Sequence, residues 1–589
     1  MNDKGGITMF SVFKKLSWYF KEQWVRYSLA ITALIIVNVI VIIPPKLIGA
    51  AIDLIQYNQL TKEKLLEIIF SFALLIITYY SISFFWDYTL FGRSILLEKK
   101  MRSRLMNHFM KMTPTFYGRY RTGDLMARAT NDLKAINMTA GFGILTLVDS
   151  TVYMSFIIAV MLFTINWKLT LAALIPLPIM AIIMQRYGKA IHDRYMKAQA
   201  AFSDLNNDTL ESIQGVRVIR AYVQERQDQK RFANKTEDVF QKNIAVAKLD
   251  ALFEPTIVVL VGLAYTIGLG FGAYLVIRNE LTIGQLVSFN VYLGMLIWPM
   301  FAVGELINVM QRGNASLDRT EEILSQQPDV KDPENPVAVQ TPERIVFEQL
   351  TFTYPDTKIE RLKDISLTIN RGETVGVVGK TGAGKSTLFR QLLREYPPAE
   401  KGRLLINGVP IEKISFKTTR NWIGYVPQDH TLFSKSVREN ILFGRNDATD
   451  EEIYQILEMA SLKEDIDHLP EGLDTIVGES GVTLSGGQKQ RVSLARALIK
   501  DPEILILDDS LSAVDGKTET RIIEHLKVAR KNKTTLISAH RLSAVKHADQ
   551  IIVLEDGKIV EHGTHDELIR LNGWYAKQFA MQQMEGGES

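Results

Sequence analysis

Six long stretches without a charged residue occupy the first half of the chain, and they limit its possible folds more than any other feature. They are 17 to 24 residues long: Tyr27–Pro45, Ile68–Trp86, Ser150–Trp167, Leu169–Gln185, Pro255–Ile277 and Leu281–Gly304. A helix of about 20 residues crosses the hydrocarbon core of a bilayer. Buried helices of soluble proteins seldom run this long without a charge, so the pattern predicts an α-helical membrane domain with six transmembrane helices in the lipid bilayer.

The links between these stretches set the orientation. Three links are short: residues 46–67, residue 168 and residues 278–280. The two long links, Asp87–Lys134 and Arg186–Glu254, are helical in composition and rich in Lys and Arg. Basic loops stay in the cytoplasm, which places the N-terminus and residues 313–589 there. We expect the long links to be helices that continue beyond the membrane, with a turn at Thr122–Leu125 in one and within Val218–Arg231 in the other.

The remaining composition defines the domain boundaries. Phe10–Trp24 mixes aromatic residues with Lys14, Lys15 and Lys21, which is typical of an amphipathic helix at the membrane surface; an ordinary docked helix is the alternative. The net charge of +3 gives no indication of a nucleic-acid partner, and the absence of cysteine excludes disulfides and zinc–thiolate sites. The predicted division is an N-terminal amphipathic region 1–26, a transmembrane domain 27–312, a proline-containing linker 313–345, an α/β nucleotide-binding domain 346–582 and a polar tail 583–589.

The α/β domain contains a phosphate-binding loop, Gly379–Ser386, with the pattern Gly-x4-Gly-Lys-Ser. It lies between a predicted strand and a predicted helix, the context that this motif requires. Its glycines let backbone N–H groups converge on phosphate oxygens, and Lys385 neutralises the outer phosphates. Ser386 offers a hydroxyl to Mg2+. Other short β-rich runs that alternate with helical stretches are Val346–Phe352, Ile365–Ile369, Thr374–Val378, Ile423–Val426, Ile504–Leu507, Thr534–Ser538 and Ile551–Leu554.

Two further motifs complete the chemistry of this domain. Ser485-Gly486-Gly487-Gln488 precedes the helical run Lys489–Ile499, so Ser485 is expected as an N-cap beside free N–H groups, a second anion-binding helix terminus. The run Ile504–Leu507 is expected to be a buried strand that ends in Asp508, a carboxylate suited to hold Mg2+ through water.

Together these motifs resemble the nucleotide-binding domain of an ATP-binding-cassette (ABC) transporter. The resemblance implies that Tyr354 stacks on adenine, that Gln428 contacts Mg2+ and faces the membrane domain, and that His540 contacts the γ-phosphate. Val477–Glu479 is similar to the loop before the signature, and Ser510–Asp515 to the loop at the dimer interface. The implied ATP-binding residues are Tyr354, Gly379, Lys380, Thr381, Gly382, Ala383, Gly384, Lys385, Ser386 and Thr387, with Mg2+ held by Ser386, Gln428 and Asp508.

Six spans followed by one such domain resemble the layout of an ABC exporter half. Gly141–Ser150 and Val309–Ser316 resemble most closely one subunit of the bacterial heterodimeric multidrug exporters. The resemblance implies ATP-driven efflux of amphipathic drugs or other hydrophobic compounds across the cytoplasmic membrane. In this family two nucleotide domains dimerise head to tail, so Ser485 and Gly487 would act on the partner's ATP. The helical tips near Thr122–Met126 and Val223–Gln229 would transmit the motion. Export of lipid or peptide, or a sensor complex, remains open.

One position departs from the family pattern. Hydrolytic members carry glutamate after the strand carboxylate to polarise the attacking water, and this chain has Asp509. Asp509 is one methylene shorter, which withdraws its carboxylate by roughly 1.5 Å, and a 1 Å misplacement can cost about 10²-fold in rate. We therefore expect the chain's own ATP site, with Asp509, His540 and Gln428, to hydrolyse slowly. The alternative is that Asp509 is a slower but adequate base. The expected partner is a second, non-identical half-transporter that carries the glutamate.

Acidic residues interrupt or bound the spans, and they are candidates for binding small hydrophobic or cationic substrates. Glu305 lies 24 residues after Leu281, about 36 Å along a helix, and therefore near the inner leaflet. Asp87, Asp149 and Glu254 fall at a similar depth. A ring of Asp149, Glu254 and Glu305 could favour cations; solvated helix extensions are the equal alternative. Four aromatic residues could contact apolar substrates or simply pack: Phe289, Tyr292, Trp298 and Phe301.

Overall fold

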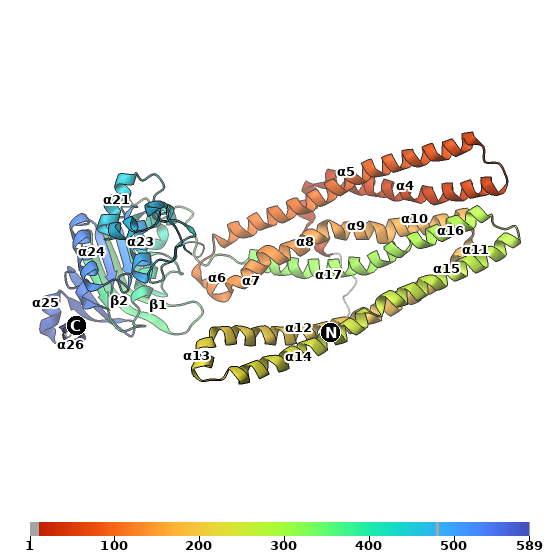
Figure 1. Cartoon of the computed structure of the whole chain (residues 1–589). Coiled ribbons are helices and arrows are strands. Elements are labelled where there is room, and N and C mark those ends of the chain that lie inside the picture. Colours follow the sequence, from red (N-terminus) through yellow and green to blue (C-terminus); the bar gives the residue numbers. More distant parts are fainter. Residues whose placement is uncertain (1–10, 479–481, 588–589) are drawn as a thin grey trace. The chain divides into compact units, whose positions relative to one another are not determined.

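The computed structural model describes residues 11–478 and 482–587, which form two compact units (Figure 1). One unit contains the chain up to Asn107 together with Gly123–Ser325. The other contains His108–Thr122 and the chain from Gln326 onward. The tip of the first long link, residues 108–122, therefore belongs to the same unit as the α/β domain.

The first unit is helical and contains six helices that are long and apolar enough to cross a membrane: Trp24–Gln56, Lys62–Phe109, Thr122–Ile165, Trp167–Gln214, Glu225–Ile277 and Ile283–Ser325. Each of these helices contains most or all of one predicted span, which confirms the six-helix prediction. The third predicted span runs past its helix by two residues, and the sixth begins two residues before its helix. The third and fourth helices are separated at Asn166, not at Lys168. Asn166 is extended, and its side chain accepts hydrogen bonds from the N–H groups of Lys168 (3.0 Å) and Leu169 (3.1 Å), so it caps the helix that begins at Trp167.

Several of these helices are divided into shorter elements. The elements are α4 Trp24–Gln56, α5 Lys62–Phe109, α7 Thr122–Ala127, η1 Arg128–Asp132, α8 Leu133–Ala140, α9 Phe142–Val148, η2 Asp149–Tyr153, α10 Met154–Val160, η3 Met161–Ile165, α11 Trp167–Leu174, α12 Pro176–Gln214, α14 Glu225–Asp250, α15 Phe253–Ile277, α16 Ile283–Met295 and α17 Ile297–Ser325. The elements η1, η2 and η3 are π-helical turns. Such turns are frequent at functional sites because they rotate the following side chains relative to a regular helix.

The short helices at the two tips are α6 Pro114–Arg119 and α13 Val216–Ala221 (Figure 1). The short helix predicted to start at Thr122–Leu125 is confirmed as α7, the start of the returning helix, and the first tip itself is the preceding α6. The break predicted within Val218–Arg231 is confirmed as the turn at residues 222–224, between α13 and α14. Pro114 stands in the first turn of α6, where its fixed backbone angle suits helix initiation.

Close contact between α4 and α16 holds the first and last spans together. A side chain at Gly49 would place its Cβ 2.5 Å from the Gly284 carbonyl oxygen, so only glycine fits. Asp53 accepts hydrogen bonds from the Thr282 hydroxyl (2.7 Å) and the Gly284 N–H (2.8 Å) at the N-terminus of α16. The Tyr292 hydroxyl donates to the Ile42 carbonyl oxygen at 2.7 Å.

The four aromatic residues considered as substrate contacts divide into two pairs. Phe289 and Tyr292 are fully buried in the core of the first unit and are packing residues. Trp298 and Phe301 keep 48% and 40% of their surface exposed. Only the second pair is therefore open to a ligand in this chain.

The N-terminal segment forms two short helices, α2 Ser11–Lys15 and α3 Ser17–Glu22, while Phe10 lies outside the described residues. Lys15 does not face headgroups as predicted, because it is paired with Asp318 and, at 3.3 Å, with Glu321 of α17. Lys14 and Lys21 are exposed. The segment is a helix docked on α17 with part of its basic face free.

The predicted linker 313–345 begins later than expected, because α17 continues to Ser325. An ion-pair network holds this last part of α17 against η1. Arg319 Nε donates to Asp132 Oδ2 at 2.9 Å, and the Ser316 hydroxyl donates to Asp132 Oδ1 at 3.0 Å. Arg128 pairs with Glu322 at 3.0 Å. The start of the predicted linker is therefore part of α17, and its charged residues Arg319 and Glu322 contact η1.

The second unit contains three sheets in the described residues. Their strand orders are β2-β1-β4-β5, β12-β11-β3-β10-β9-β6 and β7-β8. The strands are β1 Arg344–Thr353, β2 Glu360–Asn370, β3 Thr374–Val378, β4 Lys401–Ile406, β5 Val409–Pro410, β6 Ile423–Val426, β7 Lys435–Ser436, β8 Ile476–Val477, β9 Ile504–Asp508, β10 Thr534–Ser538, β11 Gln550–Glu555 and β12 Lys558–Gly563. All seven predicted runs are strands. The other five strands lie outside the predicted apolar runs. β4 and β12 carry charged residues and expose most of one face, and β5, β7 and β8 have only two residues each.

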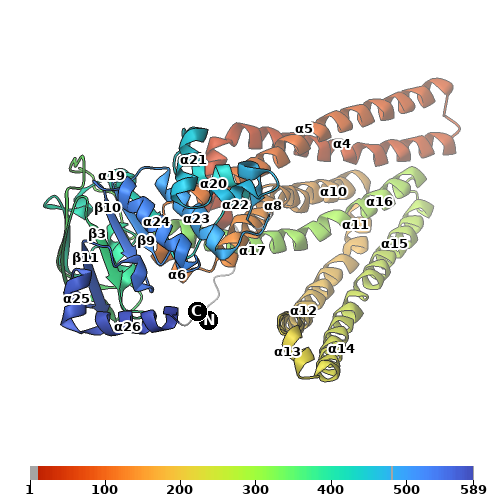
Figure 2. The same cartoon turned by 60° about the vertical axis from the view of Figure 1, so that its left-hand side comes forward.

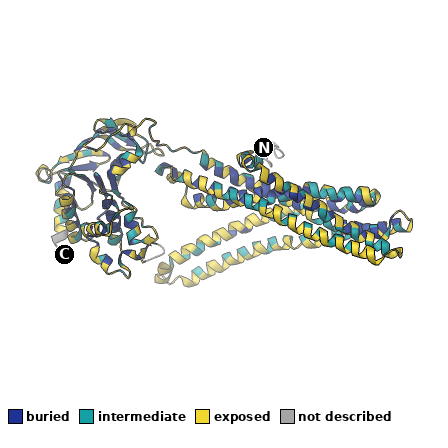
Figure 3. Ribbon diagram, turned by 90° about the horizontal axis from the view of Figure 1, so that it is seen from above, coloured by how far each residue is buried: buried dark blue, intermediate teal, exposed yellow. Residues whose placement is uncertain are grey.

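Helices flank the six-stranded sheet (Figure 2). They are α18 Lys385–Leu392, α19 Phe416–Trp422, α20 Val437–Leu442, α21 Asp450–Met459, α22 Lys463–Asp467, α23 Gly486–Leu498, α24 Gly516–Ala529, α25 His565–Leu571 and α26 Trp574–Gly587, with 3-10 turns η4 Ile411–Lys413, η5 Gly472–Asp474 and η6 Leu542–Ala544. The predicted polar tail 583–589 is instead helical as far as Gly587, since α26 continues through it. The core of the unit lies on both faces of the sheet (Figure 3).

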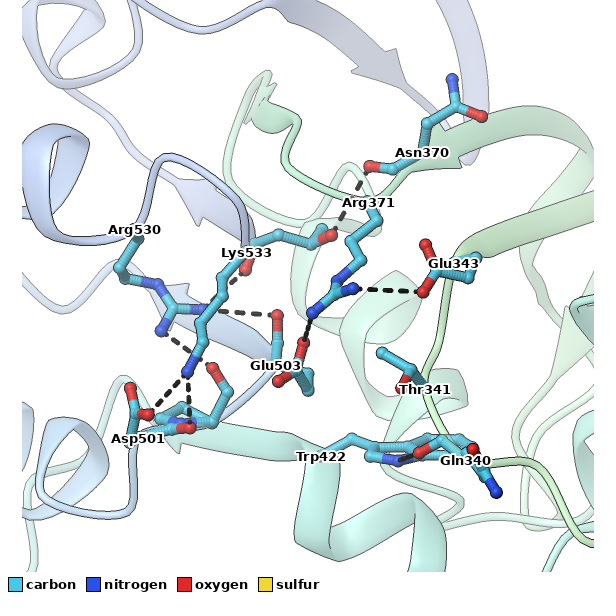
Figure 4. Close-up of polar contacts among 12 residues, drawn as sticks. Gln340, Thr341, Glu343, Asn370, Arg371, Trp422, Asp501, Glu503, Arg530 and Lys533 are labelled. Atoms are coloured by element: carbon cyan, nitrogen blue, oxygen red, sulfur yellow. Dashed lines mark hydrogen bonds and ion pairs between the residues drawn. The ribbon is translucent and has the colours of Figure 1, made fainter.

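The buried side chain of Arg530 connects the N-terminal ends of β9 and β10 (Figure 4). Arg530 donates to the carbonyl oxygens of Pro502 (2.9 Å) and Thr534 (2.9 Å) and to the Thr535 hydroxyl (3.2 Å). Burial lowers the pKa of Arg530 to about 10. Arg371, nearby, forms more exposed ion pairs with Glu343 (3.1 Å) and Glu503 (2.8 Å).

Replacement of Arg530 should destabilise the second unit far more than replacement of Arg371. Arg530→Met leaves buried carbonyl oxygens without donors, at a cost of at least about 3 kcal/mol, which lowers the melting temperature by roughly 6–12 °C. The matched Arg371→Met removes partly exposed pairs that contribute about 0–1 kcal/mol each. Thermal unfolding of the full-length variants in detergent measures both shifts, and equal shifts would contradict this account.

Candidate functional site

The phosphate-binding loop connects β3 to α18 and depends on its glycines. Gly379 has φ +143°, and a Cβ there would lie 2.1 Å from the Leu554 carbonyl oxygen. Gly384 has φ +110° and directly precedes α18. Lys385 Nζ donates to the carbonyl oxygens of Gly379 (2.8 Å) and Lys380 (3.2 Å), so the lysine folds back over its own loop. Burial lowers the pKa of Lys385, and the nearby Asp509 and Asp508 oppose that shift. Phosphate oxygens would take over the role of the two carbonyls.

Ser386 and Asp508 lie together at the end of the central strands. The Ser386 hydroxyl donates to Asp508 Oδ1 at 3.0 Å, and the Tyr425 hydroxyl lies 3.5 Å from Asp508 Oδ2. Asp508 is 2% exposed, and burial raises its pKa while the Ser386 hydrogen bond lowers it. The contact predicted from two motifs 122 residues apart in sequence is therefore present.

The donors at this position fit a magnesium ion. Mg2+ prefers oxygen ligands and usually takes only one or two carboxylates, with phosphates and water completing its shell. Ser386 offers a hydroxyl, Asp508 a carboxylate and Gln428 an exposed amide just beyond β6. Among the residues that the structure describes, no group of three or more His, Cys, Asp or Glu side chains could hold a metal ion. A magnesium ion here would therefore need phosphate and water ligands in addition to these side chains.

Tyr354 lies beside the first turn of α18. Its hydroxyl is 2.9 Å from the Thr387 hydroxyl and accepts from Arg390 Nη1 at 3.3 Å. Its ring stands at 82° to that of Tyr396, with centroids 4.8 Å apart. Arg390 and Tyr396 were missed by the sequence analysis because only the folded chain places them beside the predicted adenine contact.

The helical tip α6 reaches the same region of this unit. Arg119 Nη2 lies 2.8 Å from Asp356 Oδ1, two residues after Tyr354. Both side chains are about half exposed. No sequence pattern joins Arg119 to Asp356, so this contact was also missed.

Asp509 adopts an unusual backbone conformation. Its φ is +50°, in the left-handed region that most side chains avoid. Its N–H donates to the Ser538 carbonyl oxygen at 3.0 Å, which fixes it against β10. Asp509 Oδ2 lies 3.9 Å from His540 Nε2, and both line a cavity of about 240 Å³. The structure therefore brings together the two residues predicted to act on the γ-phosphate.

His540 is held in place by the C-terminal helix, which the sequence analysis did not anticipate. Gln582 of α26 donates to the His540 carbonyl oxygen at 2.8 Å and accepts from the Leu542 N–H at 2.9 Å. Arg541 Nη1 lies 3.0 Å from Glu519 Oε2 and anchors the same loop to α24.

Ser485 caps α23 as predicted. Its hydroxyl accepts from the Gln488 N–H at 3.3 Å, and Gln488 Oε1 accepts from the Ser485 N–H at 2.9 Å, a complete capping box. Ser485 and Gly486 are exposed, whereas Gly487 packs against Ala513. Within the described part of the chain, no hydrogen bond joins residues 485–488 to the phosphate-binding loop. Glu479, in the predicted loop before the signature, lies outside the described residues.

The three candidate substrate acids are in different environments. Asp149 is 7% exposed and accepts hydrogen bonds from Trp298 Nε1 (2.9 Å) and Asn38 Nδ2 (3.3 Å). Glu305 lies 3.5 Å from Arg312, and Glu254 is exposed. Asp149 lines a cavity together with Asp87, whereas Glu254 and Glu305 are not among the residues that line it.

Comparisons with known proteins identify both units. Residues 27–300 match the family model described as the ABC transporter transmembrane region, and residues 362–512 match the model described as ABC transporter. A solved structure described as a bacterial Atm1-family ABC exporter with ATP bound is similar to this chain with a TM-score of 0.78. It is 26% identical and the match covers 95% of this chain and 99% of that chain.

Curated relatives extend the similarity over nearly the whole length. The probable multidrug resistance ABC transporter ATP-binding/permease protein YheI of Bacillus subtilis is 58% identical over 98% of this chain and 100% of that protein. The multidrug resistance-like ATP-binding protein MdlA of Escherichia coli is 42% identical, covering 98% and 97%. The ATP-dependent lipid A-core flippase of Pseudomonas fluorescens is 35% identical, covering 85% and 82%.

The family models, these relatives and the nucleotide-site geometry agree. The chain belongs to the ABC exporters: it is a multi-pass protein of the cytoplasmic membrane whose cytoplasmic domain binds ATP and hydrolyses it to drive transport.

Proposed function

We propose that this chain is one half of a heterodimeric exporter that removes amphipathic drugs or other hydrophobic compounds, and that its own ATP site is degenerate. The observation that carries the proposal is the presence and the fixed backbone of Asp509 at the position where hydrolytic family members have glutamate. Its backbone is pinned to Ser538 and its side chain is one methylene shorter than glutamate. Positioning of the attacking water is a large part of what protein groups contribute to phosphoryl transfer. A withdrawn carboxylate therefore favours prolonged ATP binding over hydrolysis at this site.

The intact signature supports a second, faster site on a partner. Ser485 and Gly486 are exposed at the N-terminus of α23, where their N–H groups can meet a phosphate from another molecule. This chain has a shortened carboxylate at Asp509 and a complete signature at residues 485–488. That combination fits a non-identical partner that supplies the catalytic glutamate. In this arrangement Ser485 and Gly487 complete the active site of the partner.

We also propose that Mg2+ is held at the chain's own site by Ser386, Gln428 and Asp508. When bound, the ion would neutralise phosphate charge. Ser386 and Asp508 are already in contact at 3.0 Å, so they are positioned without rearrangement of the strand ends.

Lipid export is a second candidate, because the 35% identical lipid A-core flippase shares this architecture. Peptide export or a sensor role has no specific support in the chain. Multidrug export has the stronger support, because the 58% and 42% identical relatives both carry that description. Uptake of fluorescent drugs and of labelled lipid by inside-out vesicles containing the pair would separate the two candidates.

Restoring the carboxylate length should accelerate hydrolysis at the chain's own site. Asp509→Glu is expected to raise the ATPase rate of the chain purified alone by about 10- to 100-fold. The matched Asp509→Asn should change the slow wild-type rate less than about threefold. Steady-state phosphate release in lipid nanodiscs measures both variants. Brisk wild-type hydrolysis that Asp509→Asn abolishes would establish Asp509 as an adequate base and overturn the proposal.

Ser485 and Asp509 should contribute unequally to the ATPase rate when the chain is paired with a half-transporter that carries the catalytic glutamate. Ser485→Ala is expected to lower the ATPase rate of the pair at least tenfold, because the signature serves the active site of the partner. Asp509→Asn should leave at least half of the rate. The opposite ranking would place the fast site on this chain.

Magnesium-dependent ATP binding should weaken on mild acidification. Because burial raises the pKa of Asp508, protons compete with Mg2+ at a higher pH than at an ordinary aspartate, and the affinity falls as pH drops through that raised pKa. Binding of fluorescent ATP, measured from pH 8 to pH 5 with Mg2+ or with EDTA, tests this. Asp508→Asn should remove the Mg2+-specific pH dependence, and a wild-type profile that is flat throughout this interval would contradict the prediction.

A further inference from the structure

A cavity of about 510 Å³ lies within the membrane domain, between α4, α5, η2 and the start of α17. Its volume falls in the usual range of about 300–1,000 Å³ for sites that bind small molecules. Six aromatic side chains contribute to its wall: Tyr79, Tyr80, Phe84, Trp86, Tyr153 and Trp298. Two carboxylates, Asp87 and Asp149, also line it, and none of the described lining residues is basic.

Of the three predicted substrate acids, Asp149 alone is among the described residues that line this cavity, and no described cationic side chain forms an ion pair with it. Its two hydrogen-bond donors, Trp298 Nε1 and Asn38 Nδ2, are both neutral. Other acids of the same unit are treated differently: Asp132 is paired with Arg319, and Glu305 with Arg312. A buried carboxylate without a counter-ion is costly in a membrane. A cationic ligand would remove that cost.

The wall also contains polar groups that the chain leaves unpaired. Ser83 Oγ and Trp86 Nε1 are buried and have no hydrogen-bond partner among the described residues. Asn38 is 7% exposed and donates its amide N–H group to Asp149. Buried polar groups are normally paired, so Ser83 and Trp86 indicate a wall shaped for an additional molecule.

Backbone geometry places Asp149 and Tyr153 at this cavity. Both belong to the π-helical turn η2, Asp149–Tyr153. On the opposite element, Trp298 follows the break between α16 and α17 and stands next to Pro299. Both parts of the wall therefore depart from regular helix at the residues that face the cavity, a frequent feature of functional sites.

We propose that this cavity is the substrate site for an amphipathic organic cation, whose charge lies between Asp149 and Asp87 and whose aromatic or apolar part packs against the aromatic wall. The inference rests on the proposed efflux function and specifies its substrate class. Aromatic faces attract cations as well as apolar groups, so one wall recognises both parts of such a molecule. Glu254 and Glu305 have no role in this site.

The test uses the full-length chain in zwitterionic lipid nanodiscs without ATP, and two probes of similar shape. The cationic probe is radiolabelled methyltriphenylphosphonium, and the neutral probe is triphenylphosphine oxide. We expect the wild type to bind the cation at least tenfold more tightly than the neutral probe. Asp149→Asn should weaken cation binding at least tenfold and change binding of the neutral probe less than threefold. Asp87→Asn should weaken cation binding about three- to tenfold.

Glu305→Gln is the matched control, since it neutralises an acid of the same domain outside the cavity, and it should leave both affinities within twofold. Retained binding of the neutral probe shows that the membrane domain of each variant is folded, and Asp87, which is exposed, provides a substitution with little risk to folding. Unchanged cation binding in both aspartate variants would overturn the proposal, as would an equal loss of both probes. Failure here is separate from failure of the efflux proposal, because binding is measured without hydrolysis, transport or a partner.

Discussion

Parallel pairing of the central strands aligns the groups that handle ATP. β3, β10, β9 and β6 run side by side with Val377 opposite Ser538, Ser538 opposite Asp508 and Leu507 opposite Val426. In a parallel sheet the carboxyl ends of the strands meet at one edge, where ligands bind. Asp508 is the last residue of β9, and the phosphate-binding loop, His540 and Gln428 follow the ends of β3, β10 and β6. A shift of one residue in the β3–β10 or the β10–β9 pairing would separate Ser386 from Asp508.

The motifs of the nucleotide site could be predicted from sequence to a large extent, whereas the pairing of the strands could not. The residues Gly379–Ser386 and Ser485–Gln488 carry their conformation in their own chemistry, through glycines with positive φ and a self-contained capping box. Apolar strands of β-branched residues were equally clear. Their order in the sheet was not, because register is set by packing across the whole unit.

Other features could not be predicted because they depend on residues distant in sequence. Lys15 meets Asp318 across 303 residues, and Arg319 meets Asp132 across 187. Local composition made the first look like a headgroup contact, and nothing near Arg319 in the sequence indicated its partner. Asp149 and Asn38 lie on different helices and 111 residues apart, so counting residues per turn along one helix cannot place them relative to each other. Support residues such as Tyr425 and Gln582 have no motif of their own.

The two units use buried acidic groups in different ways. In the second unit Asp508 accepts a hydrogen bond from the Ser386 hydroxyl. In the first unit Asp132 accepts hydrogen bonds from the Arg319 guanidinium and the Ser316 hydroxyl. Asp149 receives only neutral donors. Such donors orient a carboxylate without cancelling its charge, so an attraction for cations remains in the cavity. In the proposed magnesium site the charge of Asp508 is likewise available, in that case for a metal ion bound to the phosphates of ATP.

The proposed degeneracy of the ATP site depends on a small covalent difference, the one methylene by which Asp509 is shorter than glutamate. The φ of +50° at Asp509 and its N–H bond to Ser538 fix the backbone, so the main chain cannot advance to compensate for the missing methylene. His540 is fixed as well, through Gln582. With the backbones of both residues held, the reach of the Asp509 carboxylate depends on the length of its side chain. A site that grips ATP and rarely cleaves it can keep two nucleotide domains associated over several cycles of a faster site, which gives the proposed heterodimer a physical reason to be asymmetric.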